Sequence, residues 1–454
     1  MTQLSQEQEE DEKGKDGQIT TRVLPGFMEL LPAEQIVFDG IKAVIEAVYE
    51  KYGFVALDTP VIERAEVLLA KAGGETEKQI YQFTKGDNDL ALRFDLTVPL
   101  ARYVSEHAND LVFPFRRCHI GKVYRGEKPQ KGRYREFYQC DIDIIGDGSL
   151  SLMNDAEIPS VINEVFSKLD FGPFVIKISN RKLITGLLDS LEAGNQSVGI
   201  IQTIDKLEKV GENEVRGLLV ALGVPNPAIR EIFQFIGING TPQEMLMALR
   251  NLCVDNDIFR QGVSELDEVV CAMQALGVPE DRYVIDLTIA RGLDYYTGTV
   301  YETVLRDYPG LGSICSGGRY DNLAEKYTDR KLPGVGISIG LTRLFSQLKE
   351  IGLIKTSVAT PTKVLVVPLV EDMSMPLEIA KRIREAGIST EVYFEDTKMK
   401  NKLTYANKKG IPFVVLVGED EIKSGLFAVK NMETGEQVML AKEAIAAHIN
   451  EAMK

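Results

Sequence analysis

Two short segments of the sequence alternate residue types in a way that suits binding of a small cationic ligand. In residues 138–145 the alternation places Gln139, Asp141 and Asp143 on one face of a predicted strand and Cys140, Ile142 and Ile144 on the other. Residues 92–98 repeat the pattern with Arg93, Asp95 and Thr97. An Asp95 carboxylate can pair with an ammonium group, and an Asp143 carboxylate with an imidazole N–H. The solvated face of an edge strand has the same pattern, so the segment between the two strands matters.

That segment is strongly basic. It predicts a strand, a long loop and a second strand over residues 119–139. Against one acid, Glu127, it and its flanks carry eight basic residues: Arg116, Arg117, Lys122, Arg125, Lys128, Lys131, Arg133 and Arg135. A polyanion could dock here, and Arg125 would suit a phosphate, because a planar guanidinium holds two oxygens at once and stays charged. A solvated basic loop would explain the charge but not the interspersed aromatic and glycine residues.

Residues 283–343 add a second cation and a glycine-rich backbone. The pattern predicts that Arg291 lies at the end of an apolar strand, near a transferring phosphate. Tyr295 and Tyr296 follow, predicted on opposite faces, so that one packs in the core while the other faces a pocket. The glycines of residues 315–322 and 334–340 would let the backbone approach a flat ligand, and Arg343 falls in the first turn of the next helix. These glycines match neither a phosphate-binding P-loop nor a dinucleotide-binding fingerprint.

The elements that must position these residues suggest an α/β protein of several domains. Strands joined by loops are predicted over 90–145, a helix over 156–169, and helices throughout 181–282, which resembles an inserted helical domain. After a catalytic part, 18–350, and a linker over 351–361, residues 362–454 alternate strand and helix. This rhythm predicts a separate small domain with a mostly parallel sheet.

Composition excludes several classes of protein. The net charge is -15, but residues 1–17 hold six acids against two lysines and are predicted to be a disordered tail. Five widely spaced cysteines without a Cys-x-x-Cys pair suggest neither a disulfide framework nor a thiolate zinc site, and three histidines make a multi-histidine metal site improbable. The start of the chain does not resemble a signal peptide and no long apolar run follows, so a cytoplasmic, soluble protein is expected.

Taken together, these motifs closely resemble the histidyl-tRNA synthetase family, from about Gln18 to the C-terminus. Residues 124–146 resemble motif 2 of class II synthetases, 291–302 and 316–323 the two histidine-specific signatures, and 334–344 motif 3. The segment through Pro60 resembles motif 1, the dimer element, and 362–454 an anticodon-binding domain. The resemblance implies an antiparallel catalytic sheet flanked by helices, with the helical insertion and a C-terminal α/β domain. It also implies a homodimer, ATP with Mg²⁺, and the substrates L-histidine and tRNA(His).

The resemblance also implies roles for individual residues. The α-amino group of histidine would be held by Asp95, Thr97 and Gln139, with Leu96 in the same binding segment, and the imidazole by Asp143 and Tyr296, beside Tyr295. Arg125 and Arg291 would be catalytic, bridging the histidine carboxylate and the α-phosphate, while Glu127, Arg133 and Arg343 would bind ATP. No metal ligand is assigned.

Three residues depart from the expected family pattern. Thr342 replaces an acid, Ser316 a glycine or alanine, and Asn322 a glycine. The change at Thr342 removes an expected acidic partner for Arg343.

Three other functions remain possible at this point. The first is the synthetase-like regulatory subunit of ATP phosphoribosyltransferase, a binding module that typically lacks the C-terminal domain. The second is a domain that senses uncharged tRNA, and the third a class II ligase for another amino acid, which would alter the residues 291–296. The general base of the transfer step is unassigned, and His119 is interpreted as structural.

Overall fold

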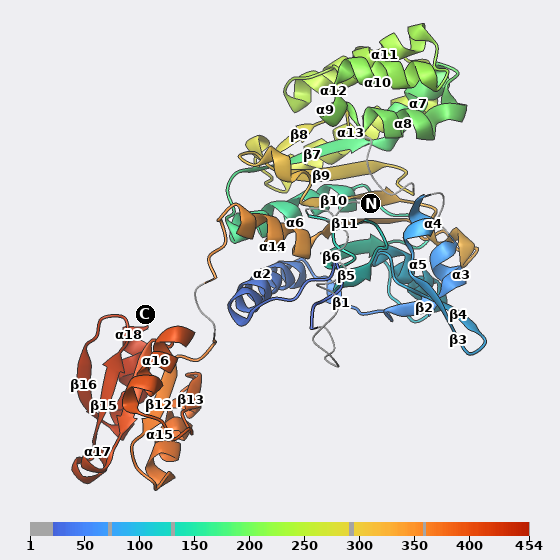
Figure 1. Cartoon of the computed structure of the whole chain (residues 1–454). Coiled ribbons are helices and arrows are strands. Elements are labelled where there is room, and N and C mark those ends of the chain that lie inside the picture. The colour runs from blue at the N-terminus through green and yellow to red at the C-terminus, as the bar shows by residue number, and fades with distance from the viewer. Residues whose placement is uncertain (1–20, 71–74, 129–131, 290–294, 357–359, 454) are drawn as a thin grey trace, which may run out of the picture. The chain divides into compact units, whose positions relative to one another are not determined.

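The computed structural model describes residues 21–70, 75–128, 132–289, 295–356 and 360–453 (Figure 1). These form two compact units. The first comprises Lys42–Leu353 with the described residues before Glu29, and the second comprises Glu29–Ile41 with Ile354–Lys454. Helix α2 (Pro32–Lys51) contributes residues to both.

The first unit is built on an eight-stranded sheet in the order β1-β5-β6-β11-β10-β9-β7-β8. Its strands are β1 (Val55–Ala56), β5 (Phe115–Tyr124), β6 (Glu136–Ile145), β7 (Phe174–Asn180), β8 (Tyr283–Ile285), β9 (Thr299–Leu305), β10 (Cys315–Tyr320) and β11 (Gly334–Ile339). All pairings from β5 to β7 are antiparallel, and only the two edge pairings, β1 with β5 and β7 with β8, are parallel. The antiparallel sheet expected from the resemblance is therefore confirmed.

Two helices are hydrogen-bonded to the central strands of the sheet. Tyr49 of α2 donates a hydrogen bond to the backbone oxygen of Cys140 in β6. Cys140 lies on the apolar face of β6, where Ile142 and Ile144 are also fully buried. Tyr301 of β9 donates in turn to the backbone oxygen of Asp155 in α6 (Met153–Leu169). Burial of one face leaves the polar face of β6 to line a cavity.

A smaller sheet, β2-β4-β3, precedes the central strands. It consists of β2 (Ile62–Arg64), β3 (Gln82–Lys85) and β4 (Asn88–Leu92), with helices α3 (Ala65–Leu69), α4 (Glu75–Gln79) and α5 (Thr97–Glu106). The prediction of a strand over 92–98, and of strands alone over 90–145, is wrong, because β4 ends at Leu92 and α5 begins at Thr97. Asp95 accepts the backbone N–H of Val98 at 2.9 Å, and Pro99 fits a first helical turn, which needs no N–H from that residue.

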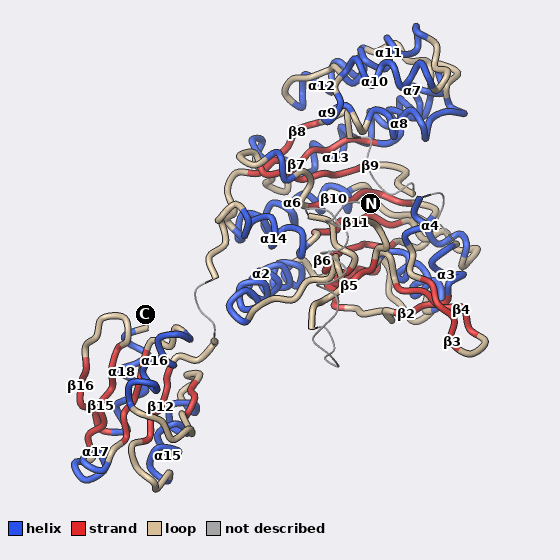
Figure 2. The backbone as a smooth tube through the Cα atoms, in the orientation of Figure 1, coloured by secondary structure: helices blue, strands red, loops and turns tan. Residues whose placement is uncertain are grey.

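The segment predicted to be helical, residues 181–282, is helical (Figure 2). It contains α7 (Arg181–Ser190), α8 (Ser197–Ile204), α9 (Leu207–Val210), α10 (Glu212–Ala221), α11 (Asn226–Ile236), α12 (Pro242–Asn251) and α13 (Asp257–Ala275). It leaves the sheet after β7 and returns at β8, the parallel neighbour of β7. After β11, helix α14 (Leu341–Glu350) buries Leu341, Leu344, Phe345 and Leu348 on one face, as predicted.

The second unit has a five-stranded sheet in the order β13-β12-β14-β15-β16. The strands are β12 (Val364–Pro368), β13 (Thr390–Val392), β14 (Phe413–Val417), β15 (Leu426–Asn431) and β16 (Gln437–Ala441), and the helices are α15 (Ser374–Glu385), α16 (Met399–Lys409), α17 (Glu419–Ser424) and α18 (Lys442–Ala452). The prediction of a mostly parallel sheet is wrong, since β12 pairs in parallel with β13 and β14, whereas β15 pairs antiparallel with β14 and β16. Strands β14, β15 and β16 are joined in sequence by short connections, which antiparallel neighbours permit and parallel neighbours do not.

Candidate active site

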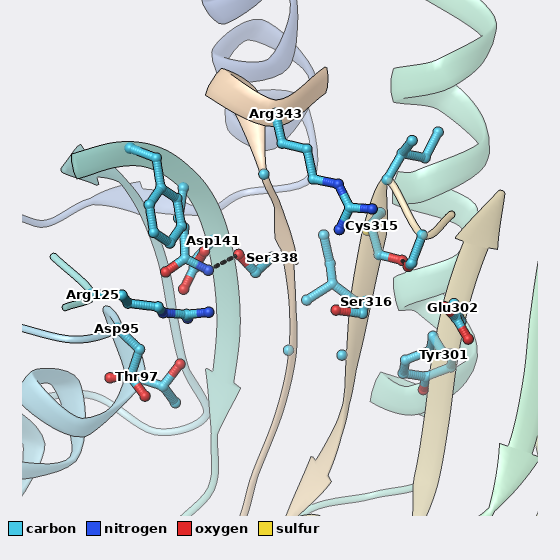
Figure 3. A pocket seen from close by; sticks show the side chains of 18 of the residues that line it. Asp95, Thr97, Arg125, Asp141, Tyr301, Glu302, Cys315, Ser316, Ser338 and Arg343 are labelled. Carbon is cyan, nitrogen blue, oxygen red and sulfur yellow. Dashed lines mark hydrogen bonds between the residues drawn. The ribbon is translucent and has the colours of Figure 1, made fainter. Parts of the chain in front are cut away.

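A cavity of about 480 Å³ lies over the central strands of the eight-stranded sheet (Figure 3). This is the size of a pocket for a small molecule. Ten predicted site residues line it: Asp95, Thr97, Arg125, Glu127, Arg133, Gln139, Asp143, Tyr295, Tyr296 and Arg343. They come from four segments far apart in the sequence, at 95–97, 125–143, 295–296 and 343, and the cavity brings them together.

Two other predicted residues are Leu96 and Arg291. Leu96 does not line the cavity. Its side chain is fully buried, and its backbone oxygen accepts a hydrogen bond from Arg117 Nη2 at 2.9 Å. Arg291 lies outside the described residues, and the apolar strand that precedes it in the sequence ends at Ile285.

The floor of the cavity is the polar face of β6, as the alternation predicted. Gln139, Asp141 and Asp143 all line the cavity. Across the sheet, Asp141 is paired with Ser338 of β11 and Asp143 with Gly336. A Cβ atom at Gly336 would stand 2.4 Å from the Asp143 carboxylate, so only glycine leaves that carboxylate its place.

Asp143 is held from two sides. Its Oδ1 accepts the hydroxyl of Tyr320 at 2.6 Å, and its Oδ2 forms an ion pair with Arg117 Nη2 at 2.8 Å. Arg117 is fully buried. Burial raises the pKa of Asp143, while Arg117 and the Tyr320 hydroxyl oppose that rise. The carboxylate is thus fixed in orientation before any ligand arrives.

Arg125 is fixed by its surroundings rather than by an acid. Its guanidinium stacks over the rings of Phe94, at 4.4 Å, and Phe137, at 5.1 Å, and Nε donates to the backbone oxygen of Phe94 at 3.2 Å. Burial lowers its pKa, and Asp95 opposes that shift. A cation held between two aromatic rings keeps its remaining N–H donors for a ligand.

The other two predicted cations are Arg133, between β5 and β6, and Arg343, on α14. Arg133 forms an ion pair with Glu127 at 2.9 Å. Arg343 donates to the backbone oxygen of Leu311 at 2.7 Å. Thr342, where the family resemblance suggested an acid, instead accepts the backbone N–H of Tyr138 in β6 at 2.8 Å. This residue therefore ties α14 to the pocket strand.

Tyr295 and Tyr296 both line the cavity, so the prediction that they take opposite faces is wrong. They lie outside any strand, just before β9, where side chains need not alternate. Their rings meet edge to face with centroids 5.1 Å apart. Burial raises the pKa of both hydroxyls, so both remain neutral hydrogen-bonding groups.

Several residues that line the cavity had no predicted role: Asp141, Tyr301, Glu302, Ser316, Tyr320 and Ser338. Asp141 shares the polar face of β6, and that pattern could have identified it. The other five come from strands whose register no local pattern reveals. Asn322 has a φ of −118°, so this position does not require the glycine expected from the family.

The basic hairpin is less available to a polyanion than its composition suggested. Arg116 pairs with Glu157 at 2.6 Å and Lys122 with Glu136 at 2.7 Å. His119 pairs with Asp58 at 2.7 Å, and burial lowers its pKa to about 4. Its ring does not line the cavity, in agreement with the structural interpretation.

The described residues also show the state of the cysteines and lack two further features. All five cysteines are free, in agreement with the absence of a disulfide framework. Among the described residues no helix is long and apolar enough to cross a membrane. Within the same residues no group of three or more histidine, cysteine or acidic side chains could hold a metal ion by itself.

Comparisons with known proteins agree with this geometry. Residues 26–344 match the family model for histidyl-tRNA synthetase, and residues 363–452 match that for an anticodon binding domain. The histidine–tRNA ligase of Clostridium tetani is 57% identical over 422 residues, which cover 93% of this chain and 96% of that protein. A histidyl-tRNA synthetase structure from Nostoc sp. PCC 7120 is 40% identical, with a TM-score of 0.88, over 96% of this chain and 100% of its own.

A more distant structure shares the fold alone. It is described as an ATP phosphoribosyltransferase regulatory subunit/histidyl-tRNA synthetase from Bacillus halodurans, with 19% identity and a TM-score of 0.71 over 86% of this chain and 97% of its own. The family model and the near relatives, by contrast, cover most of the chain, and the residues matched by the family model include the predicted motifs. The chain therefore belongs to the histidyl-tRNA synthetase family.

Proposed function

We propose that the cavity of the first unit carries out both steps of histidine–tRNA ligation, the reaction of the family to which the chain belongs. Histidine is first activated with ATP to histidyl-adenylate, and the histidyl group then passes to the 3′ end of tRNA(His). The observation that carries the proposal is the convergence of ten sequence-predicted residues on one cavity of suitable size.

Histidine binds with its polar groups against β6 and the start of α5. Asp95, Thr97 and Gln139 receive the α-amino group, while Asp143 and Tyr296 receive the imidazole and Tyr295 lines the same side. Asp143 suits this role because Arg117 and Tyr320 fix its orientation. A site built to hydrogen-bond both imidazole nitrogens rejects amino acids that lack them, by up to roughly 10⁴-fold.

The arginines carry the charge of the activation step. The histidine carboxylate attacks the α-phosphate in line and pyrophosphate leaves, so negative charge spreads over the phosphoryl oxygens. Arg125, held between two rings, faces that charge as a preorganised donor, with Arg291 as its partner. Arg133 and Arg343 bind the outer phosphates or the adenine, and Glu127 belongs to the same ATP site.

Mg²⁺ bound with ATP supplies further charge neutralisation at the phosphates. Such an ion keeps several waters and needs only one or two protein carboxylates besides the phosphate oxygens. Glu127 and Glu302, the two glutamates that line the cavity, fit that requirement.

The remaining parts of the proposal concern tRNA and assembly. The second unit binds the anticodon, and the helical segment 181–282 contacts the acceptor arm. If a variant without residues 191–256 charged tRNA as well as the full chain, the proposed contact with the acceptor arm would be wrong. The protein is a cytoplasmic homodimer in this proposal, with residues through Pro60 at the dimer contact, and its molecular mass in solution tests that assembly.

The deciding experiment is histidine-dependent ATP–pyrophosphate exchange by the purified protein, with the other amino acids as controls, followed by charging of total tRNA. Exchange with histidine alone, followed by charging, is the expected result. Histidine binding without exchange would instead favour a regulatory subunit, and exchange with another amino acid would show a ligase of different specificity.

A further inference from the structure

Among the described residues, three aspartates line the cavity, and two of them are already engaged. Asp95 Oδ1 accepts the backbone N–H of Val98 and so serves the first turn of α5. Asp143 has Tyr320 on one oxygen and Arg117 on the other. Both carboxylates are therefore tied to the protein framework.

Asp141 differs from both, because no cation among the described residues forms an ion pair with it. Oδ2 of Asp143 also lacks a hydrogen bond, but it has Arg117 Nη2 at 2.8 Å. The side chain of Asp141 is only 2% exposed, yet its Oδ1 is buried with no hydrogen-bond partner among the described residues. The same holds for Oε1 of Gln139, two residues earlier on the same face. Leaving buried acceptors without partners costs free energy, so such atoms in a cavity point to a ligand.

Gln139 and Asp141 are linked through one serine. Gln139 Nε2 donates to the hydroxyl of Ser338 at 2.7 Å, the hydrogen bond drawn at Ser338 in Figure 3. Asp141 also hydrogen-bonds that serine. Because Nε2 of Gln139 is turned to Ser338, the other end of its amide, Oε1, is left without a partner. Two cavity-lining side chains on one face of β6 thus each keep an acceptor oxygen without a partner.

Two such acceptors fit a group with several donors. An ammonium group has three N–H donors in a tetrahedral arrangement, whereas a neutral imidazole has a single N–H donor on one of its two nitrogens. We infer that Asp141 is a specificity-determining residue that accepts a hydrogen bond from the α-ammonium group of histidine, beside Gln139. This rests on the proposed function, since it requires that the cavity bind histidine.

The test uses Asp141→Asn, which keeps the shape of the side chain but removes its charge and one acceptor. In pyrophosphate exchange we expect KM for histidine to rise at least tenfold, the cost of losing a hydrogen bond to a charged group, with KM for ATP changed less than about twofold. An unchanged KM for histidine would overturn the inference. An inactive wild-type protein would instead defeat the proposed function itself.

Two competitive inhibitors locate the contact on the ligand. Histamine keeps the amine and the imidazole, whereas imidazole-4-propionate lacks the amine. Asp141→Asn should weaken inhibition by histamine by about the same factor as it raises KM for histidine, and leave inhibition by imidazole-4-propionate within about twofold. Equal weakening of both would show that Asp141 acts on the imidazole or only on the pocket's structure. If the asparagine variant fails to fold, Asp141→Ser is compared in the same way.

Discussion

Two buried arginine–aspartate pairs of the first unit differ in how completely they are hydrogen-bonded. Arg319 of β10 meets Asp155 of α6 with Nε at 3.0 Å from Oδ1 and Nη2 at 2.6 Å from Oδ2, and Nη2 also donates to the backbone oxygen of Leu150 at 3.1 Å. Arg117 meets Asp143 through Nη2 alone, at 2.8 Å, and its Nε and Nη1 are buried with no hydrogen-bond partner among the described residues.

The two pairs also differ in whether they line the cavity. Neither member of the fully bonded pair lines the cavity, whereas Asp143 of the other pair does. A pair that only joins a strand to a helix can use all its hydrogen bonds for that purpose. A pair at a ligand site must keep some bonding capacity for a partner that is absent during folding, at a cost in stability.

Breaking the fully bonded pair should have the largest effect. Arg319→Met leaves the Asp155 carboxylate buried without its cation, and we expect the free energy of unfolding to fall by about 3–5 kcal/mol. The measurement is urea unfolding followed by circular dichroism. Arg330→Met is the matched control, because the Arg330–Asp147 pair is 40% and 36% exposed and should contribute less than about 1 kcal/mol. Equal losses in both variants would remove the distinction between the pairs.

Changing the pair at the cavity should mainly impair catalysis. Asp143→Asn keeps an acceptor for Tyr320, and Asp141 still faces Arg117, so its loss of stability should be smaller than that of Arg319→Met. We expect kcat/KM for histidine in pyrophosphate exchange to fall about 100-fold or more, because a charged hydrogen-bond partner is lost. Tyr296→Phe should impair the same reaction with folding intact. Unchanged exchange in either variant would refute the assignment of the imidazole site.

The pH profile should separate Asp141 from the paired carboxylates. Burial raises the pKa of Asp141 to about 7, against the opposing charge of Arg117. Below that pH the Asp141 carboxyl group of the empty cavity is protonated and no longer offers a charged acceptor to an ammonium group. We therefore expect kcat/KM for histidine to fall by up to about tenfold per unit as the pH drops below 7, and Asp141→Asn to lack this limb.

The surroundings of Asp141 contain other titrating groups, and both proteins in that comparison share them. Asp95 and Asp143 act on it directly and have raised pKa values of their own. His119, its register partner on β5, has a pKa of about 4. The substrate imidazole also titrates in both cases, so the difference between the two profiles reports Asp141. Identical profiles would contradict the prediction.

The smallest expected effect concerns a neutral bond. Thr342→Val removes the hydroxyl that accepts the N–H of Tyr138, and should cost about 1 kcal/mol of unfolding free energy. Thr342→Ser keeps the hydroxyl and serves as the control. A valine variant as stable as the serine variant would show that this bond does not hold α14 to β6.

The sequence predicted the pocket face of β6 correctly because a strand has a strict period of two, so Gln139 and Asp143 had to share a face. Residues 92–98 show the same alternation but contain the start of a helix. Asp95 accepts the backbone N–H of Val98, and Pro99 fits the first helical turn. Tyr295 and Tyr296 were misplaced because their segment is irregular and has no period. The contrast between Asp141 and Asp143 depends on Tyr320, which lies 177 residues from Asp143 in the chain. No local pattern reports such a contact.

The parallel pairing of β7 with β8 has a consequence for engineering and evolution. Because the chain leaves β7 and re-enters at the adjacent edge strand, with Ile176 opposite Tyr283, everything between them is attached to the sheet at one margin. Replacing the whole segment from α7 to α13 with that of a relative would alter neither the order nor the register of the strands under the cavity. If the segment contacts tRNA as proposed, it is a replaceable module on which RNA preference can diverge while the chemistry of activation stays unchanged.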